Sequence, residues 1–209
     1  MRFISFEGPE GSGKSTQIKL LADSLRQKKQ SVICIREPGG TQLGENIRKI
    51  LMSDYRNNIS ILSELLMFQA SRAQLVEEVI LPALKQGDWV LCDRFIESTI
   101  VYQGFGRNID LNHINLLNKI VTAGITPNIT FLLQLDVNTG FKRIKKRYNN
   151  DDSKFDRFEK EDVNFHHKIY QGYNEVAEKS DRIIKIDANQ SINVISEEIL
   201  AQVLKKENF

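Results

Sequence analysis

The chain has 209 residues, 27% of them charged, and a formal net charge of +2 at pH 7. This length suits one α/β domain over residues 1–209, and the near-balanced charge gives no reason to expect nucleic acid as a partner. No apolar run approaches a membrane span, and the first predicted strand leaves no room for a signal peptide, so we expect a cytoplasmic protein that binds no membrane.

Short apolar segments alternate with helical patterns along the chain. We predict strands near residues 2–7, 32–36, 89–93, 129–135 and 183–187. We predict helices near residues 14–28, 43–52, 60–86, 95–105, 110–123, 138–148, 160–179 and 191–205. Short apolar strands between amphipathic helices are typical of a parallel sheet covered by helices on both faces. The pattern predicts a three-layer α/β/α fold around a five-stranded parallel sheet, with a kink or break at Pro82.

The cysteines and histidines show no metal-site spacing. Cys34 and Cys92 lie inside apolar strand segments, so we expect both in the core of a reduced protein. His113, His166 and His167 have no Cys or His partners at zinc-site spacing, and we expect all three at the surface.

A glycine-rich segment between the first strand and the first helix carries the most informative motif. It reads GPEGSGKS and matches G-x-x-x-x-G-K-[ST] without a mismatch. A loop in this context binds phosphates, with Lys14 reaching the β and γ oxygens and Ser15 binding Mg²⁺. The alternative is a chance glycine-rich turn, and the strand–loop–helix context argues against it. The residues predicted to bind the nucleotide are Gly8, Pro9, Glu10, Gly11, Ser12, Gly13, Lys14, Ser15 and Thr16.

Charged residues follow the second and third predicted strands. Glu37 lies in a turn that reads REPGGT, and Asp93 and Arg94 end the third strand. Because loops at the carboxyl ends of parallel strands form the ligand crevice, Glu37 could belong to an acceptor site. Asp93 could hold Mg²⁺ through water, and Arg94 could grip a second phosphate. A plain turn and a local Asp–Arg ion pair are the alternatives, and both stay open on the motifs alone.

Two helical segments carry residues that could recognise a base. Phe68 and Arg72 are four residues apart and share a helix face, so a base could stack on Phe68 while Arg72 donates to its carbonyls. Thr99 and Gln103, with Tyr102 beside them, form a second polar face that could touch a base or a sugar. Spacing alone favours the simpler interpretation of Phe68 as a core residue and Arg72 as a surface charge.

A basic segment interrupts the alternation at residues 142–160, around the turn-forming run Asn149-Asn150-Asp151-Asp152-Ser153. A charged loop is usually just solvated. Beside a phosphate-binding loop, however, we favour a mobile lid over the phosphates.

These motifs in this order resemble the thymidylate kinases, the P-loop kinases that transfer the γ-phosphate of ATP to dTMP. The resemblance covers nearly the whole chain. It runs through GPEGSGKS, REPGGTQLGE at 36–45, FQASR at 68–72, DRFIESTIVYQG at 93–104, PNITFLLQLDV at 127–137 and DRFE at 156–159. It implies a P-loop NTPase fold, Mg²⁺, the substrates ATP and dTMP, and a homodimer.

For the phosphates, the resemblance implies that Lys14 and Ser15 handle ATP and Mg²⁺ and that Asp93 holds Mg²⁺ through water. Arg94 would bind the dTMP phosphate, with Arg48 as a second candidate. The acceptor side would also include Glu10, near the deoxyribose 3′-OH, and Glu37, near the metal and the acceptor phosphate.

For the nucleoside, the resemblance implies that Phe68 stacks on thymine and Arg72 hydrogen-bonds its edge. Thr99 and Gln103 would complete base recognition. Tyr102 would pack against the sugar where a ribose 2′-OH would otherwise lie, which favours deoxyribose.

The position of the arginines points to the bacterial lid-arginine class, because the variable P-loop positions hold no arginine while the lid supplies Arg143, Arg147 and Arg157. Arg147 is the first candidate to bridge the phosphates, and Arg143 would lie against the adenine. The expected catalytic residues are Lys14, Arg94, Arg147 and Glu10. Gln134 departs from the family, which often has an acid at this position.

Two other functions stay open at this point. One is another P-loop nucleoside monophosphate or deoxynucleoside kinase with the same core. The other is a nucleotide-gated switch, although the chain contains no guanine-selecting N-K-x-D motif.

Overall fold

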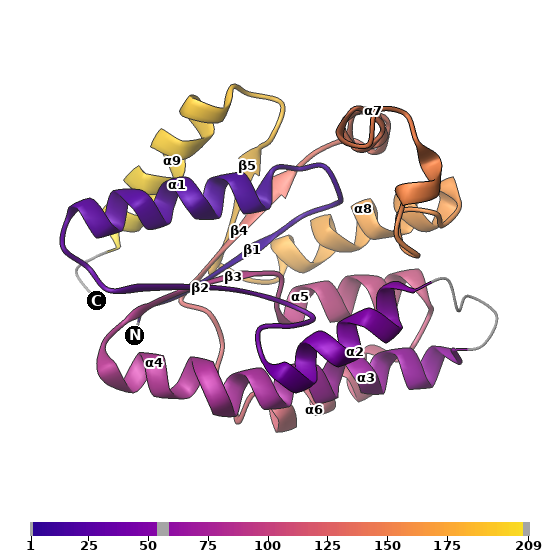
Figure 1. The fold of residues 1–209 in the computed structure, drawn as a ribbon, viewed down its shortest axis with the longest axis horizontal. Coiled ribbons are helices and arrows are strands. Elements are labelled where there is room, and N and C mark those ends of the chain that lie inside the picture. The colour runs from indigo at the N-terminus through magenta and orange to yellow at the C-terminus, as the bar shows by residue number, and fades with distance from the viewer. Residues whose placement is uncertain (1, 54–58, 207–209) are drawn as a thin grey trace.

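A five-stranded parallel sheet runs through the centre of the molecule (Figure 1). The computed structural model describes residues 2–53 and 59–206. The strand order is β2-β3-β1-β4-β5. The strands are β1 (Phe3–Glu7), β2 (Val32–Arg36), β3 (Trp89–Asp93), β4 (Ile129–Gln134) and β5 (Ile183–Asp187). The predicted five-stranded parallel sheet is confirmed, and each strand begins and ends within one residue of its expected bounds.

Helices cover both faces of the sheet. The α-helices are α1 (Lys14–Gln27), α2 (Gln42–Met52), α3 (Ile61–Leu75), α4 (Leu81–Gln86), α5 (Ile96–Thr99), α6 (Leu111–Val121), α7 (Val137–Arg147), α8 (Val163–Glu178) and α9 (Ile192–Lys205). Helices α1 and α9 pack on one face through side chains such as Leu21 and Ile199. Two apolar clusters cover the opposite face. One contains Ala83 of α4, and the other contains Ile169 and Tyr173 of α8. Burial of apolar side chains on both faces explains why the strands read as continuous apolar runs.

The long helical pattern at residues 60–86 is one helical path with a local change of hydrogen bonding. Between α3 and α4 the π-helix η1 (Val76–Ile80) replaces α-helical bonding, and Pro82 lies in the first turn of α4. Proline has no N–H to donate, so a change of helical bonding near it is expected. In place of the kink or break predicted at Pro82, the structure has the π-helix η1, which ends two residues before the proline. A second π-helix, η2 (Ile100–Gly106), continues α5.

The sheet register brings the predicted motifs to one edge. Asp93 at the end of β3 pairs with Phe6 of β1 and with Arg36 of β2. The glycine-rich loop, the REPGGT turn and the Asp93-Arg94 pair therefore leave the sheet side by side, as expected for a crevice at the carboxyl ends of parallel strands.

Two expectations about the burial of single residues, Cys34 and His166, are wrong. Cys34 is exposed rather than in the core, because β2 is an edge strand; Cys92, in the middle of the sheet, is buried as expected. His166 is half-buried rather than at the surface, with its ring centroid 4.7 Å from that of Phe141. Its neighbours in α8 and α7 account for the burial.

None of the helices within residues 2–53 and 59–206 is long and apolar enough to cross a lipid bilayer.

Candidate active site

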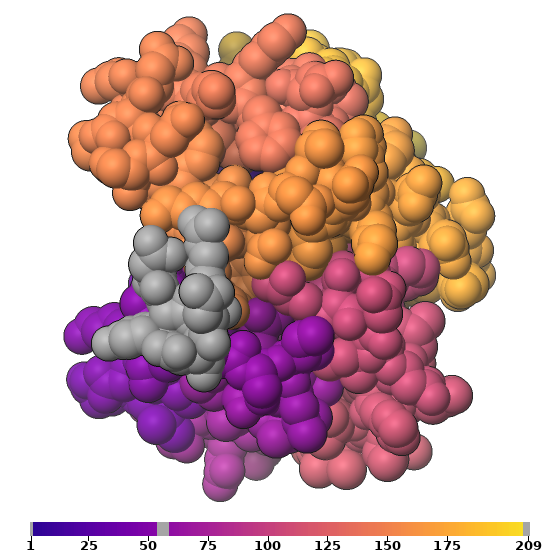
Figure 2. All heavy atoms as spheres, turned by 90° about the vertical axis from the view of Figure 1, so that its right-hand side faces the viewer, coloured from indigo at the N-terminus to yellow at the C-terminus, as the bar shows by residue number. Residues whose placement is uncertain are grey.

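A cavity of about 550 Å³ lies at the carboxyl edge of the sheet, between the glycine-rich loop and the 142–160 segment. Figure 2 shows that segment together with α8 above the side of the molecule formed by α2 and α3. Most of the predicted site residues line this cavity. They are Glu10, Gly11, Gly13, Lys14, Ser15, Thr16, Glu37, Arg48, Phe68, Arg72, Asp93, Arg94, Thr99, Tyr102, Gln103, Arg143 and Arg147.

The glycine-rich loop needs glycine because backbone passes close behind it. Gly8 has a φ of 137°, and a Cβ there would stand 2.5 Å from the backbone oxygen of Leu133. A Cβ on Gly11, whose φ is 76°, would stand 2.8 Å from the backbone oxygen of Gly140. The loop can therefore turn tightly against β4 and α7 only with these glycines.

Lys14 lies buried inside this loop. Its Nζ donates to the backbone oxygens of Gly8 at 3.1 Å and Pro9 at 3.0 Å, and to Ser12 Oγ at 3.5 Å. Burial lowers the pKa of Lys14, and the positive charge of Arg94 lowers it further. The amine is thus held by neutral oxygens at the loop, next to the space that phosphates would fill. Gly8, Pro9 and Ser12 do not line the cavity, but they hold Lys14 in place.

Ser15 and Asp93 form the pair that could hold a metal ion. Ser15 Oγ donates to Asp93 Oδ2 at 2.7 Å, from the start of α1 to the end of β3. A hydroxyl and a carboxylate fit Mg²⁺, which keeps several waters and binds only one or two protein oxygens beside phosphates. The alternative of a local Asp93–Arg94 ion pair is wrong, because Arg94 pairs with Glu10 instead.

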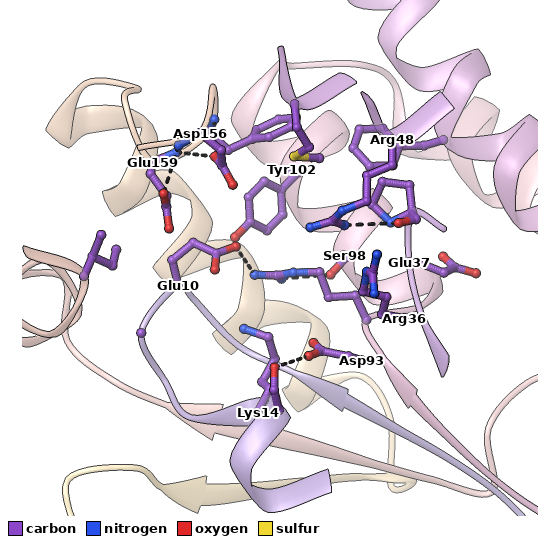
Figure 3. Close-up of a pocket in the computed structure, with 18 of the residues that line it drawn as sticks. Glu10, Lys14, Arg36, Glu37, Arg48, Asp93, Ser98, Tyr102, Asp156 and Glu159 are labelled. Atoms are coloured by element: carbon purple, nitrogen blue, oxygen red, sulfur yellow. Dashed lines mark hydrogen bonds and ion pairs between the residues drawn. The ribbon is translucent and has the colours of Figure 1, made fainter. Parts of the chain in front are cut away.

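Arg94, at the end of β3, is one of the cations that line the cavity. Figure 3 shows three of its neighbours, Glu10, Ser98 and Tyr102. Its φ is 71°, and its guanidinium lies 5.1 Å from the ring centroid of Tyr102. One nitrogen pairs closely with Glu10, and the other donates to Ser98 Oγ at 3.1 Å and Tyr173 Oη at 2.9 Å. The side chain is therefore fixed from several sides while it faces the cavity.

Glu10 is ionised although it is largely buried. Burial opposes the charge, but Arg94 and then Lys14 outweigh that effect and hold the pKa of Glu10 at about 2. In Figure 3, Glu10 lies between Lys14 and Asp93 on one side of the cavity and Asp156 and Glu159 on the other.

Glu7 lies buried beneath Arg94. Its carboxylate accepts from the backbone N–H of Phe95 at 2.7 Å and of Ser98 at 3.3 Å. It also accepts from Ser98 Oγ at 2.6 Å and Tyr173 Oη at 3.0 Å. Burial, with a smaller contribution from the nearby charge of Glu97, raises the pKa of Glu7 to about 7.

Arg72 is fully buried, so its interpretation as a surface charge is wrong. Its Nε donates to Glu37 at 2.8 Å, and one terminal nitrogen donates to Thr99 Oγ1 and Asn118 Oδ1, both at 2.9 Å. The other terminal nitrogen contacts Glu37 at 2.6 Å and the backbone oxygen of Phe95 at 2.9 Å. The five N–H groups thus all have protein partners.

The arginines of the 142–160 segment differ in what they contact. Arg143 donates to the backbone oxygens of Ala188 at 3.0 Å and Gly11 at 3.3 Å, which ties α7 to the glycine-rich loop. Arg147, half exposed, pairs with the buried Glu159 at the cavity. Arg157 is buried against Glu64 of α3 and does not line the cavity.

Further lining residues were not singled out from the sequence. They are Arg36, Pro38, Met52, Ser98, Ile144, Tyr148, Asp156, Phe158 and Glu159. Most of them stand inside motifs already quoted, REPGGT, DRFIES and DRFE, so the motifs were the available signal. Gln134, the departure from the family, donates to Asn174 of α8 at 2.6 Å.

Comparison with known proteins gives one consistent result. The family profile described as "Thymidylate kinase" matches residues 6–199. The chain is 43% identical to a thymidylate kinase of Exiguobacterium sp., with 98% of this chain and 94% of the relative covered. It is also 43% identical to a thymidylate kinase of Trichodesmium erythraeum, with 98% and 96% covered. A crystal structure of thymidylate kinase from Ehrlichia chaffeensis superposes with a TM-score of 0.77 at 34% identity, covering 96% of this chain and 97% of that one.

Proposed function

Because the chain belongs to the thymidylate kinase family, we propose that the cavity at the sheet edge binds ATP and dTMP side by side. The enzyme is a nucleoside monophosphate kinase that transfers the γ-phosphate of ATP to dTMP and releases dTDP and ADP. The expected function, enzyme class and ATP co-substrate are thereby confirmed. The residues of the cavity would form three groups: a donor side that binds ATP, an acceptor side that binds dTMP, and a lid that closes over both.

The donor side is the glycine-rich loop with Lys14, Ser15 and Asp93. Lys14 would move from the loop oxygens to the β- and γ-phosphates of ATP, whose negative charge it would stabilise. Ser15 and Asp93 would hold Mg²⁺, the latter through water, and the ion when bound would neutralise charge on the same phosphates.

The acceptor side is Arg94 with Glu10. Arg94 would bind the dTMP phosphate, and Arg48, which donates to the backbone oxygen of Pro38 at 3.1 Å, stands as a second candidate. The ionised Glu10 would accept from the deoxyribose 3′-OH. The attacking phosphate oxygen is already anionic, so alignment and surrounding cations, rather than a strong base, would provide the catalysis.

The thymine would stack on Phe68, with Thr99 and Gln103 at its polar edge and Tyr102 against the sugar. Arg72 has no N–H left over in this structure. We therefore assign it first to holding Thr99 and Glu37, and direct donation to the base would require it to exchange a partner.

Residues 142–160 would act as the lid of the lid-arginine class. Arg147 would release Glu159 and bridge donor and acceptor phosphates as the lid closes and excludes water. Arg143 would stay against the loop and border the adenine. Arg157, held by Glu64, would anchor the lid rather than reach the phosphates.

One observation carries these assignments: the Ser15–Asp93 pair and the Arg94–Glu10 pair face one cavity together with Lys14. The test is ADP release from the protein with ATP and Mg²⁺ against dTMP, dUMP, dCMP, dAMP, dGMP and thymidine. We expect dTMP to be preferred and Lys14→Ala to reduce kcat by a factor on the order of 100 or more. Lys19→Ala, exposed on the same helix, is the matched control, and near-normal turnover of Lys14→Ala would contradict the assignment.

Arg147→Ala separates a transition-state role from a binding role. We expect kcat to fall while the KM for dTMP changes little. A rise in KM alone would make Arg147 a binding residue.

We also propose that the protein forms a homodimer. Its cytoplasmic location stays a prediction from the sequence. Leu62 and Leu66 of α3 and Leu116 and Ile120 of α6 are 47% to 64% exposed on helices that pack against each other. A shared apolar face of this kind fits a second copy of the same chain.

A further inference from the structure

Glu64 is a buried carboxylate that the reaction itself does not use. It lies on α3, one turn before Phe68, and only 2% of its surface is exposed. Arg107 donates to both of its oxygens at 3.3 Å, and Arg157 pairs with it closely. The third partner is Gln103, whose Nε2 donates to Glu64 Oε1 at 2.9 Å.

This contact determines how the amide of Gln103 is oriented. A carboxylate paired with two guanidinium groups offers acceptors only, so the amide must turn an N–H toward it. The opposite orientation would place the amide carbonyl against the carboxylate oxygen. The assignment of the amide nitrogen and oxygen therefore follows from the chemistry of the partner.

The rest of the Gln103 amide is free to meet a ligand. Gln103 lines the cavity, and none of the described residues is hydrogen-bonded to its Oε1. With one N–H given to Glu64, the remaining groups are one carbonyl acceptor and one N–H donor. Thymine presents the complement, an N3–H donor beside an O4 acceptor. Cytosine presents the reverse, an N3 acceptor beside an N4 donor.

We propose that Glu64 is a positioning residue for base selection, which holds the Gln103 amide so that its carbonyl accepts N3–H of a 4-oxopyrimidine and cytosine is refused. This inference rests on the proposed binding of dTMP in the cavity. The neighbouring Thr99 fits this arrangement, because its Oγ1 accepts from Arg72 and its hydroxyl proton can be donated to O4. A cytosine nucleotide would leave the held amide of Gln103 mispaired, and a buried polar group without its partner is a strong way for a site to reject an analogue.

The test compares kcat/KM for dTMP and for dCMP in the wild type and in Glu64→Gln. A glutamine at position 64 can offer either an N–H or a carbonyl, so Gln103 is no longer held in one orientation. We expect the preference for dTMP over dCMP to fall about tenfold or more, chiefly through the KM for dTMP. Glu64→Asp keeps the charge with a shorter reach, and we expect it to lower the preference too.

Two further variants separate positioning from simple support of the fold. Arg107→Gln removes a partner of Glu64 and of Glu161 but leaves the bond to Gln103, so it should keep the dTMP preference even if the protein unfolds more easily. Gln103→Leu should lose the preference, and adding Glu64→Gln to it should change the ratio no further.

The possible results lead to distinct conclusions. Equal losses of kcat/KM for dTMP and dCMP in Glu64→Gln, or an unchanged preference in whichever Glu64 variant folds, would overturn the inference while leaving the kinase assignment intact. A wild-type protein that phosphorylates dCMP as well as dTMP would also overturn it. A wild-type protein that phosphorylates no dTMP would instead overturn the proposed binding of dTMP, and the inference with it.

Discussion

Glu7→Gln removes a buried carboxyl group whose ionisation opposes folding. The pKa of Glu7 rises from 4.5 to about 7 in the folded protein, first because of burial and then because of Glu97. A shift of this size corresponds to about 3 kcal/mol between the folded and unfolded states.

The sign of the effect follows from the direction of this shift. Below about pH 4.5 the carboxyl is protonated in both states, and the folded protein has its full stability with respect to this group. As the pH rises through 7, the folded state gives up a proton that the unfolded state released earlier, and that stability is lost. The free energy of unfolding should therefore fall with pH across this window.

Glutamine can replace the protonated carboxyl without losing its hydrogen bonds. The two partners of Oε1 are backbone N–H groups, which can only donate. The two partners of Oε2 are the hydroxyls of Ser98 and Tyr173, which can reverse and accept. The proton of Glu7, or the amide NH₂ of the variant, therefore fits at Oε2.

The assay is urea unfolding of the wild type and Glu7→Gln at pH 5 and pH 8. We expect the variant to gain about 2–3 kcal/mol relative to the wild type between these two values. Glu197→Gln, at an exposed position of α9, is the control for the loss of one negative charge. A difference between Glu7→Gln and the wild type that stays constant from pH 5 to pH 8 would refute the reasoning.

Three further predictions concern other parts of the molecule. Arg72→Lys keeps the charge, but lysine has three N–H donors where Arg72 uses five. Thermal unfolding should therefore show that the free energy of unfolding falls by about 2 kcal/mol or more. An unchanged Tm would mean that the hydrogen bonds of Arg72 do not stabilise the fold. Leu66→Glu places a charge on the apolar face, and sedimentation equilibrium should show a dimer converted to a monomer; a monomeric wild type would contradict the dimer. An alkylating reagent should modify Cys34 in the folded protein and Cys92 only in denaturant, as mass spectrometry would show, and early modification of Cys92 would mean that β3 opens.

Much of the fold was predictable because its causes are local in the sequence. Apolar runs of strand length between helical patterns predicted the sheet, and the glycine-rich loop was recognisable from the spacing of its glycines, lysine and serine between a strand and a helix. The gathering of Lys14, Asp93 and Arg94 was also predictable, since parallel strands deliver their carboxyl ends to one edge. The exposure of Cys34 was not, because the alternation of apolar residues does not say which strand is at the edge.

The sequence by itself thus determined the sheet, the glycine-rich loop and the thymidylate kinase family of the chain. Only the tertiary structure decided which buried charges meet. Glu64 reaches Gln103 across 39 residues and Arg157 across 93, and Arg72 meets Glu37 across 35. A buried charge must find its partner wherever packing brings one within about 3 Å. No local pattern encodes that choice, so the Arg157–Glu64 ion pair and the hydrogen bond from Gln103 to Glu64 became visible only in the folded chain.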